Sequence, residues 1–140
     1  MLPAPAPAPD VPKRTIVVID DIADLVDSVV MLLEMSGYTA FGESDGAGGI
    51  RKCAEVGADL VVLDFQLPEM TGAEIGAALR AEPSLAALKI LMVSATPEAT
   101  VRQSFTGYDG FLAKPVFAED LFAAIDRLIG GGAIASRIES

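Results

Sequence analysis

The sequence contains no histidine, which excludes a Ser-His-Asp catalytic triad, a zinc site with histidine ligands and formation of phosphohistidine on this chain. It has one cysteine, Cys53, so no internal disulfide can form, and this suits a reducing compartment. Basic residues are few, because 10 Lys and Arg stand against 20 Asp and Glu, for a formal charge of -10. We therefore expect no direct nucleic-acid partner and no membrane partner, since phosphate groups attract basic surfaces.

Long hydrophobic segments are also missing. No apolar run approaches the roughly 18 residues of a membrane span. The basic pair Lys13-Arg14 follows the first apolar stretch, which is not the order of a secretory signal, so we expect a cytoplasmic protein.

Residues 1–12 alternate Pro and Ala and predict a flexible tail. A glycine triplet ends the last helical pattern, so the expected domain is 13–130 and the expected C-terminal tail is 131–140.

Short apolar runs alternate with longer segments of helical period. The strongest runs are apolar at every position, which is typical of parallel strands that are covered on both faces. The expected strands are 15–19, 38–41, 60–63, 90–93 and 111–113, of which the second is weak and is placed at an edge. The expected helices are 22–33, 46–56, 71–82, 97–105 and 117–128. This alternation predicts a doubly wound α/β fold with helices on both faces of the sheet.

Polar residues follow four of the five expected strands. The first strand ends in Asp20 and Asp21, the third in Asp64, the fourth in Ser94 and the fifth in Lys114. Any one of these acids or the serine could be an ordinary turn residue. In an open parallel sheet, however, the carboxyl ends of the strands form one rim, where ligands bind. We therefore expect three carboxylates, a hydroxyl and an ammonium group at a single site.

Three carboxylates at one rim need compensation. Two of them about 5 Å apart at an effective dielectric near 20 repel by roughly 3 kcal/mol, and one lysine leaves the cluster at a net charge of about -2. Either one acid is protonated or a divalent cation binds. Since all the available ligands are oxygens, the expected cation is Mg²⁺. Such a site is suited to phosphoryl transfer, where positioning and charge neutralisation provide most of the catalysis.

These residues resemble the receiver (CheY-like) domain of two-component response regulators. The resemblance covers about residues 13–130 and includes the acid pair, Ser94-Ala95, Lys114-Pro115 and the run from Asp64 to Gly72 that contains Pro68. It implies a flavodoxin-like, five-stranded parallel sheet of order 2-1-3-4-5. It also implies that the chain is a signalling phosphoacceptor rather than an enzyme with external turnover, within a two-component phosphorelay.

The resemblance assigns a role to each acid. Asp64 would accept a phosphoryl group from a partner's phosphohistidine and form an acyl phosphate. Asp21, Asp64 and the backbone carbonyl of Gln66 would bind Mg²⁺, with Asp20 acting mainly through water. The side chains of Gln66 and Thr96 would modulate hydrolysis of the acyl phosphate. The implied donors are a histidine kinase, a histidine phosphotransfer protein or a small acyl phosphate, and the implied output is a downstream protein target.

The same resemblance implies a switch. Ser94, with Ala95 beside it, would bind the phosphoryl oxygens, and Lys114 would pair with them. Phe111 matches the aromatic that moves toward the hydroxyl residue, although a buried core aromatic is the alternative interpretation. The 20 positions from Ser94 to Lys114 are slightly fewer than in most receivers, which leaves the output surface around the fourth helix open.

Other functions remain as alternatives. A receiver-like scaffold could bind partners without phosphorylation. An aspartyl phosphatase is less favoured, because such enzymes have a second acid where this chain has Ile22. A Ser94–Lys114 nucleophile and base pair would leave all three acids unexplained. A flavodoxin is disfavoured because the loop 20–24 lacks the Ser, Thr and Gly residues that hold a flavin phosphate.

Overall fold

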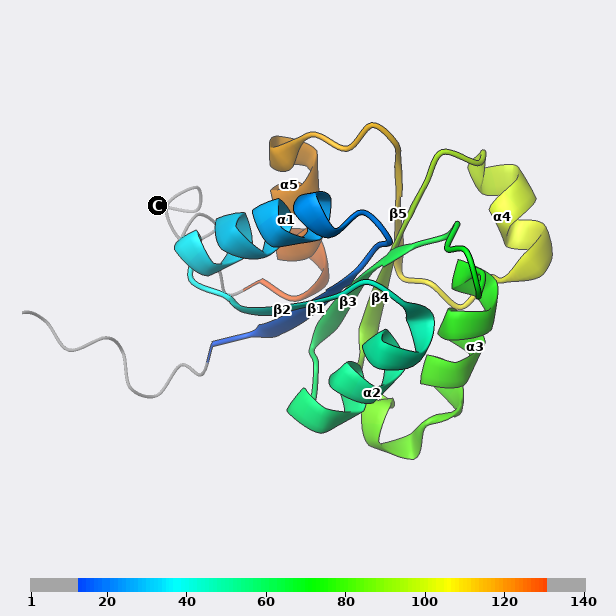
Figure 1. Ribbon diagram of the computed structural model, residues 1–140, viewed down its shortest axis with the longest axis horizontal. Helices are drawn as coiled ribbons and strands as arrows, with labels where there is room; N and C mark the ends of the chain where they lie inside the picture. The colour runs from blue at the N-terminus through cyan, green and yellow to red at the C-terminus, as the bar shows by residue number, and fades with distance from the viewer. Residues whose placement is uncertain (1–12, 131–140) are drawn as a thin grey trace, which may run out of the picture.

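The structure, a computed structural model, describes residues 13–130 and is organised around a sheet of five parallel strands (Figure 1). The strand order β2-β1-β3-β4-β5 is the flavodoxin-like order that the family resemblance implies, and β2 lies at an edge as the sequence pattern predicts. The strands are β1 (Thr15–Ile19), β2 (Thr39–Glu43), β3 (Leu60–Asp64), β4 (Lys89–Ser94) and β5 (Gly110–Ala113). The two expected tails, 1–12 and 131–140, lie outside the described residues.

Five α-helices of the described region cover both faces of the sheet. Helices α1 and α5 lie on one face, and α2, α3 and α4 lie on the other (Figure 1). Their bounds are α1 (Ala23–Met35), α2 (Gly46–Val56), α3 (Gly72–Ala81), α4 (Glu98–Ser104) and α5 (Ala118–Leu128), with a short 3-10 helix at Pro83–Leu85. Within residues 13–130, every helix is too short or too polar to span a membrane.

The fully apolar strands explain this two-layer coverage. Successive side chains of a strand point to opposite faces, so Ile16 and Val18 of β1 pack with α1 and α5, whereas Val17 and Ile19 pack with α2, α3 and α4. All five residues of β3 are buried. Because helices cover both faces, the polar residues that end the central strands lie where the chain leaves the sheet.

The expected elements are all present, with shifts at their ends. The first helix ends at Met35, two residues past the last apolar position of its pattern, and Gly37 stops it as the sequence predicts. Its end is set by Ser36, whose hydroxyl donates to the carbonyl of Leu32 at 2.9 Å, and by Gly37 at φ 98°. The third helix starts at Gly72, after a Thr71–Glu74 capping box that satisfies its first backbone N–H groups.

The shortened region around α4 is held by specific contacts. Pro97 precedes the helix as its N-cap and does not interrupt it. The guanidinium of Arg80, in α3, donates to the carbonyl of Gly107 at 2.9 Å and to the Asp109 carboxylate at 2.7 Å. These bonds connect α3 to the segment that leads into β5, so the short connection is anchored on α3.

Gly72 is required by a close backbone approach after β3. Its N–H donates to the carbonyl of Phe65 at 2.6 Å, and a Cβ at this position would lie 2.7 Å from the Cα of Phe65. At Gly76, one turn further along α3, a Cβ would instead meet the ring of Phe105, which is a side chain and can move.

We predict that Gly72→Ala destabilises the protein more than Gly76→Ala does. Alanine improves helix propensity by up to about 1 kcal/mol at either site, but overlap with a fixed backbone costs about 1–3 kcal/mol. Chemical denaturation of both variants measures the difference. Equal free energies of unfolding for the two variants would contradict this account of the loop.

Candidate functional site

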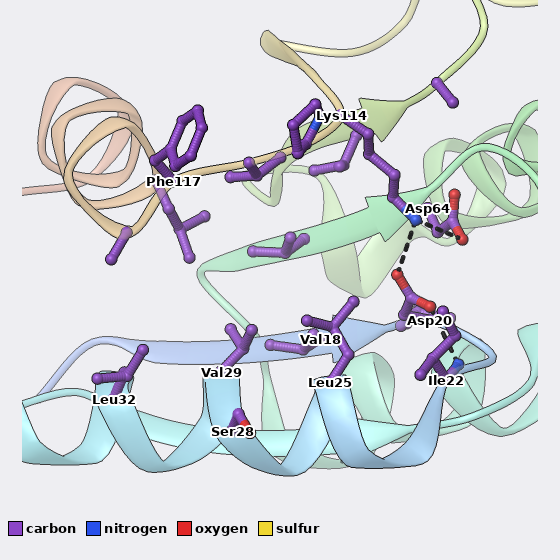
Figure 2. A pocket seen from close by; sticks show the side chains of 18 residues that line it. Val18, Asp20, Ile22, Leu25, Ser28, Val29, Leu32, Asp64, Lys114 and Phe117 are labelled. Atoms are coloured by element: carbon purple, nitrogen blue, oxygen red, sulfur yellow. Dashed lines mark hydrogen bonds and ion pairs between the residues drawn. The ribbon is translucent and has the colours of Figure 1, made fainter.

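The carboxyl ends of three strands bring together residues that are far apart in the sequence. Asp20 follows β1, Asp64 ends β3 and Lys114 follows β5. The ammonium nitrogen of Lys114 lies 3.3 Å from Asp20 Oδ2 and 3.3 Å from Asp64 Oδ2 (Figure 2). Both carboxyl side chains are more than nine-tenths buried, and Lys114 is about one-quarter exposed. The sequence prediction that these groups share one rim is confirmed.

Asp21 completes an acidic cluster at the same place. Asp20, Asp21 and Asp64 each offer a carboxylate oxygen, and these oxygens lie within 4.8 Å of one another. Asp21 is exposed, whereas the other two acids are buried. An all-oxygen donor set that is open to water on one side suits Mg²⁺, which keeps several of its own water ligands.

Short turns fix the orientation of the buried acids. Asp20 Oδ1 accepts a hydrogen bond from the N–H of Ile22, and Asp64 Oδ1 accepts one from the N–H of Gln66, each at 3.1 Å. Both bonds span two residues, which is the pattern of an Asx turn. Each carboxylate therefore directs its second oxygen toward Lys114.

Burial and charge act against each other at Asp64. Burial raises the pKa of its carboxyl group, the N–H of Gln66 lowers it, the nearby Asp20 raises it, and Lys114 lowers it; the net change is upward. For Lys114, burial by itself lowers the pKa, but the carboxylates of Asp64 and Asp20 outweigh burial and raise it. The lysine is therefore charged at neutral pH. Ionisation of Asp64 is less favourable than for an exposed aspartate, because its carboxylate is buried.

Ser94 and its neighbours occupy the end of β4. Ser94 is buried, and its hydroxyl oxygen accepts a hydrogen bond from the N–H of Thr96 at 2.8 Å. Its carbonyl accepts from the N–H of Lys114 at 2.9 Å, which links the ends of β4 and β5. Ala95 is exposed next to it. Gln66 is also exposed, and it forms an isolated bridge with Thr71 across the loop after β3.

Phe111 lies on the face of the sheet covered by α2, α3 and α4, where it is half-buried against the core. Its ring centroid is 5.9 Å from that of Tyr108. The Tyr108 hydroxyl donates to Glu98 at 2.7 Å, and Glu98 is the first residue of α4. Phe111 is thus connected to α4 through a second aromatic residue that the sequence analysis did not identify.

The comparisons with known proteins agree with this geometry. Residues 16–126 match the response regulator receiver domain. The chain belongs to this family. The regulator RpaA of Synechocystis sp., described as a DNA-binding dual master transcriptional regulator, is 32% identical over 116 residues, which are 81% of this chain and 48% of that protein. The chain therefore spans about half the length of the curated relatives that it matches.

Solved receiver structures share the fold. The chemotaxis response regulator CheY4 of Vibrio cholerae is 25% identical, with a TM-score of 0.78 over 84% of this chain and 100% of that one. The response regulator TrrA of Thermotoga maritima, solved in complex with Mg(2+)-BeF, is 22% identical, with a TM-score of 0.74 over 83% of this chain and 99% of that one. The receiver fold and its strand order are thus confirmed.

An apolar pocket of about 680 Å³ opens from the acidic site of the receiver and continues along α1 (Figure 2). We call it the α1–α5 pocket. It is bounded by the strand ends, one side of α1 and the segment from Lys114 into α5. Its lining includes Val18, Val62 and Val93 of the sheet, Leu25, Val29 and Leu32 of α1, and Val116 and Leu121 near α5.

The sequence pattern does not reveal this pocket. The apolar stripe of α1 predicts a helix packed on the sheet, yet only Val26 and Leu33 of that helix are buried. Ile22, Leu25 and Leu32 are 53%, 41% and 40% exposed. The width of the apolar stripe on α1 is the sequence feature that could have indicated the pocket. The stripe contains two adjacent rows of apolar residues, which is more than a helix needs to pack one face on a sheet.

We predict that Asp64→Asn raises the melting temperature of the metal-free protein at neutral pH. A carboxyl group with a raised folded-state pKa stabilises the fold at low pH, and this contribution is lost as the pH rises through that pKa. Thermal unfolding in a chelator-containing buffer measures the effect, which should grow as the pH increases. The exposed Asp27→Asn is the matched control, and an equal or lower melting temperature for Asp64→Asn would refute the electrostatic interpretation.

Proposed function

We propose that this receiver domain is the phosphoacceptor of a two-component phosphorelay and that Asp64 carries the phosphoryl group. The observation that supports this most directly is the position of the Lys114 ammonium, 3.3 Å from both Asp20 and Asp64. Lysine in this position can neutralise charge on a transferred phosphoryl group. We propose 13–130 as the limits of the domain.

In the proposed reaction, an Asp64 carboxylate oxygen attacks the phosphorus of a partner's phosphohistidine. The new O–P bond forms as the P–N bond breaks, and the bonding electron pair stays with the imidazole. Lys114 holds positive charge beside the phosphoryl oxygens, and its raised pKa keeps it protonated. Since the chain has no histidine, the donor must be another molecule, and a histidine kinase or histidine phosphotransfer protein provides this chemistry.

Mg²⁺ would be held by Asp21, Asp64 and the backbone carbonyl of Gln66, with Asp20 contributing through water. The three carboxylates fit this role, because their oxygens approach within 4.8 Å of one another and Asp21 faces solvent. When bound, the ion would neutralise charge on the phosphoryl oxygens. Burial, together with the nearby carboxylate of Asp20, raises the pKa of Asp64, and a cation at this position would favour the ionised form.

The proposed switch starts at Ser94. Its hydroxyl oxygen already accepts from the Thr96 N–H, so its own proton is free to be donated to a phosphoryl oxygen. Movement of Ser94 and Ala95 toward the site would make room for Phe111, whose position is relayed to α4 through Tyr108. Thr96 and Gln66, at the rim, would modulate hydrolysis of the acyl phosphate.

The output would be a protein contact made by the rearranged surface, in the cytoplasm. The acidic composition of the chain favours a protein target over nucleic acid. RpaA is named as a DNA-binding protein, and the chain matches about half of its length, so this expectation applies to the receiver domain and not to a longer regulator. Only self-phosphorylation and autodephosphorylation are expected of the domain itself.

We predict that acetyl phosphate and Mg²⁺ add one phosphoryl group to the native chain and none to Asp64→Asn. Asparagine cannot supply the attacking oxygen, so the loss should be complete. Intact-protein mass spectrometry measures the adduct, and sensitivity to hydroxylamine identifies it as an acyl phosphate. Asp27→Asn, an exposed acid on α1, should be labelled like the native chain.

Labelling of Asp64→Asn to the native level would show that Asp64 is not the acceptor. Absence of labelling from both acetyl phosphate and a panel of histidine kinases would favour the scaffold alternative, in which partners bind a receiver fold that is not phosphorylated.

We predict that Asp21→Asn weakens Mg²⁺ binding by at least about tenfold, because the ion loses a charged oxygen ligand. Asp24→Asn, which changes an exposed acid in the first turn of α1, should leave the affinity within about twofold. Calorimetry or the Mg²⁺-dependent rise in melting temperature reports the affinity. Equal losses in the two variants would place the ion outside the acidic cluster.

A further inference from the structure

The α1–α5 pocket has a polar end and an apolar body. Its polar groups converge at one end, where Asp20, Asp64 and Lys114 line it. Along the rest of its length, aliphatic side chains from the sheet, α1 and the start of α5 form the walls. A pocket of this volume and lining is typical of a small-molecule site. It fits an elongated ligand that is polar at one end only.

The length of the pocket can be read along α1. Leu25, Val29 and Leu32 follow one another on the side of α1 that faces the pocket, leading away from the acidic site (Figure 2). Two helical turns separate the first from the last, which corresponds to about 10 Å. The only hydroxyl side chain of α1 that lines the pocket is Ser28, and it donates to the carbonyl of Asp24. The body of the pocket is therefore suited to an alkyl chain.

The position of the pocket relative to Asp64 matters for phosphoryl transfer. The attacking and leaving oxygens lie roughly in line across the phosphorus. The pocket extends from Lys114 and Asp20 away from Asp64 (Figure 2). A leaving group opposite the Asp64 oxygen would therefore lie at the entrance of the apolar body.

We propose that the α1–α5 pocket selects small phosphodonors with an apolar acyl chain, so that the chain is phosphorylated faster by a medium-chain acyl phosphate than by acetyl phosphate. This proposal rests on the proposed function of Asp64. An Asp64 oxygen forms a bond to phosphorus, the bond between phosphorus and the acyl oxygen breaks, and the electron pair leaves with the carboxylate product. No proton or further reactant is needed, and the acyl chain lies along α1.

The size of the expected effect follows from burial of methylene groups. Each methylene moved from water into apolar contact is worth up to about fourfold in a binding or rate constant. Hexanoyl phosphate has four more methylenes than acetyl phosphate, and the two leaving carboxylates are nearly equal in acidity. Differences in rate between these donors therefore report contacts of the acyl chain with the pocket and not the intrinsic reactivity of the donors.

The experiment measures the second-order rate of acyl-phosphate formation on the native chain with acetyl phosphate and with hexanoyl phosphate, in Mg²⁺ buffer. We expect the hexanoyl-to-acetyl ratio to be at least about tenfold. Val29→Phe, which fills the pocket, should lower the ratio by at least about fivefold. Leu32→Gln, which adds a polar amide to the wall, should lower it in the same direction and serves if Val29→Phe does not fold.

Met31→Gln is the matched control, because Met31 is an exposed residue of the same helix that does not line the pocket. It should leave the ratio within about twofold of the native value. A native ratio near one, or a ratio that neither pocket variant changes, would overturn the proposal while leaving Asp64 as the acceptor. Absence of labelling by either donor would instead overturn the proposed function itself.

Discussion

The contact on which the site depends is the pairing of Lys114 with Asp20 and Asp64. The two ion pairs close loops of 94 and 50 residues, so they exist only when β1, β3 and β5 are assembled. Both acids are buried, and a buried carboxylate is costly unless it is paired and hydrogen-bonded. Removing the lysine would leave two buried like charges at one rim. The folded protein thus holds two mutually repelling carboxylates at this rim. A bound cation would reduce this repulsion, and a phosphoryl group on Asp64 would alter the charge of the site.

The sheet determines where these charged groups lie. The interior residues of β1, β3 and β4 are apolar and buried, so the polar residues of these strands lie only at their ends. The turn after each strand then orients one group, as the N–H of Gln66 does for Asp64. Rigid strands with short turns hold the acids in place without a bound ligand, which is the preorganisation that phosphoryl transfer requires.

The sequence predicted the elements and the rim residues because both depend on local patterns. Fully apolar runs of four or five residues identify parallel strands, and the residue that follows each run must lie at the carboxyl edge. The sequence could not predict what depends on distances between elements. It did not show that Tyr108 connects Phe111 to Glu98 of α4, or that Arg80 anchors Gly107 and Asp109. Those contacts join side chains whose separation is set by packing.

Helix α1 is a second case in which the sequence pattern did not predict an arrangement set by packing, and here the arrangement concerns the proposed function. Its apolar residues predict a helix against the sheet, and this is correct for Val26 and Leu33. Periodicity cannot tell a row that packs from a row that lines a pocket, since both are apolar and helical in spacing. Here the pocket lies between α1 and the segment from Lys114 to Phe117, and Leu25 and Leu32, which line it, are partly exposed. That segment begins with Lys114, which pairs with Asp64. A ligand that fills the pocket would therefore contact the same segment that supplies the ammonium group of the acidic site.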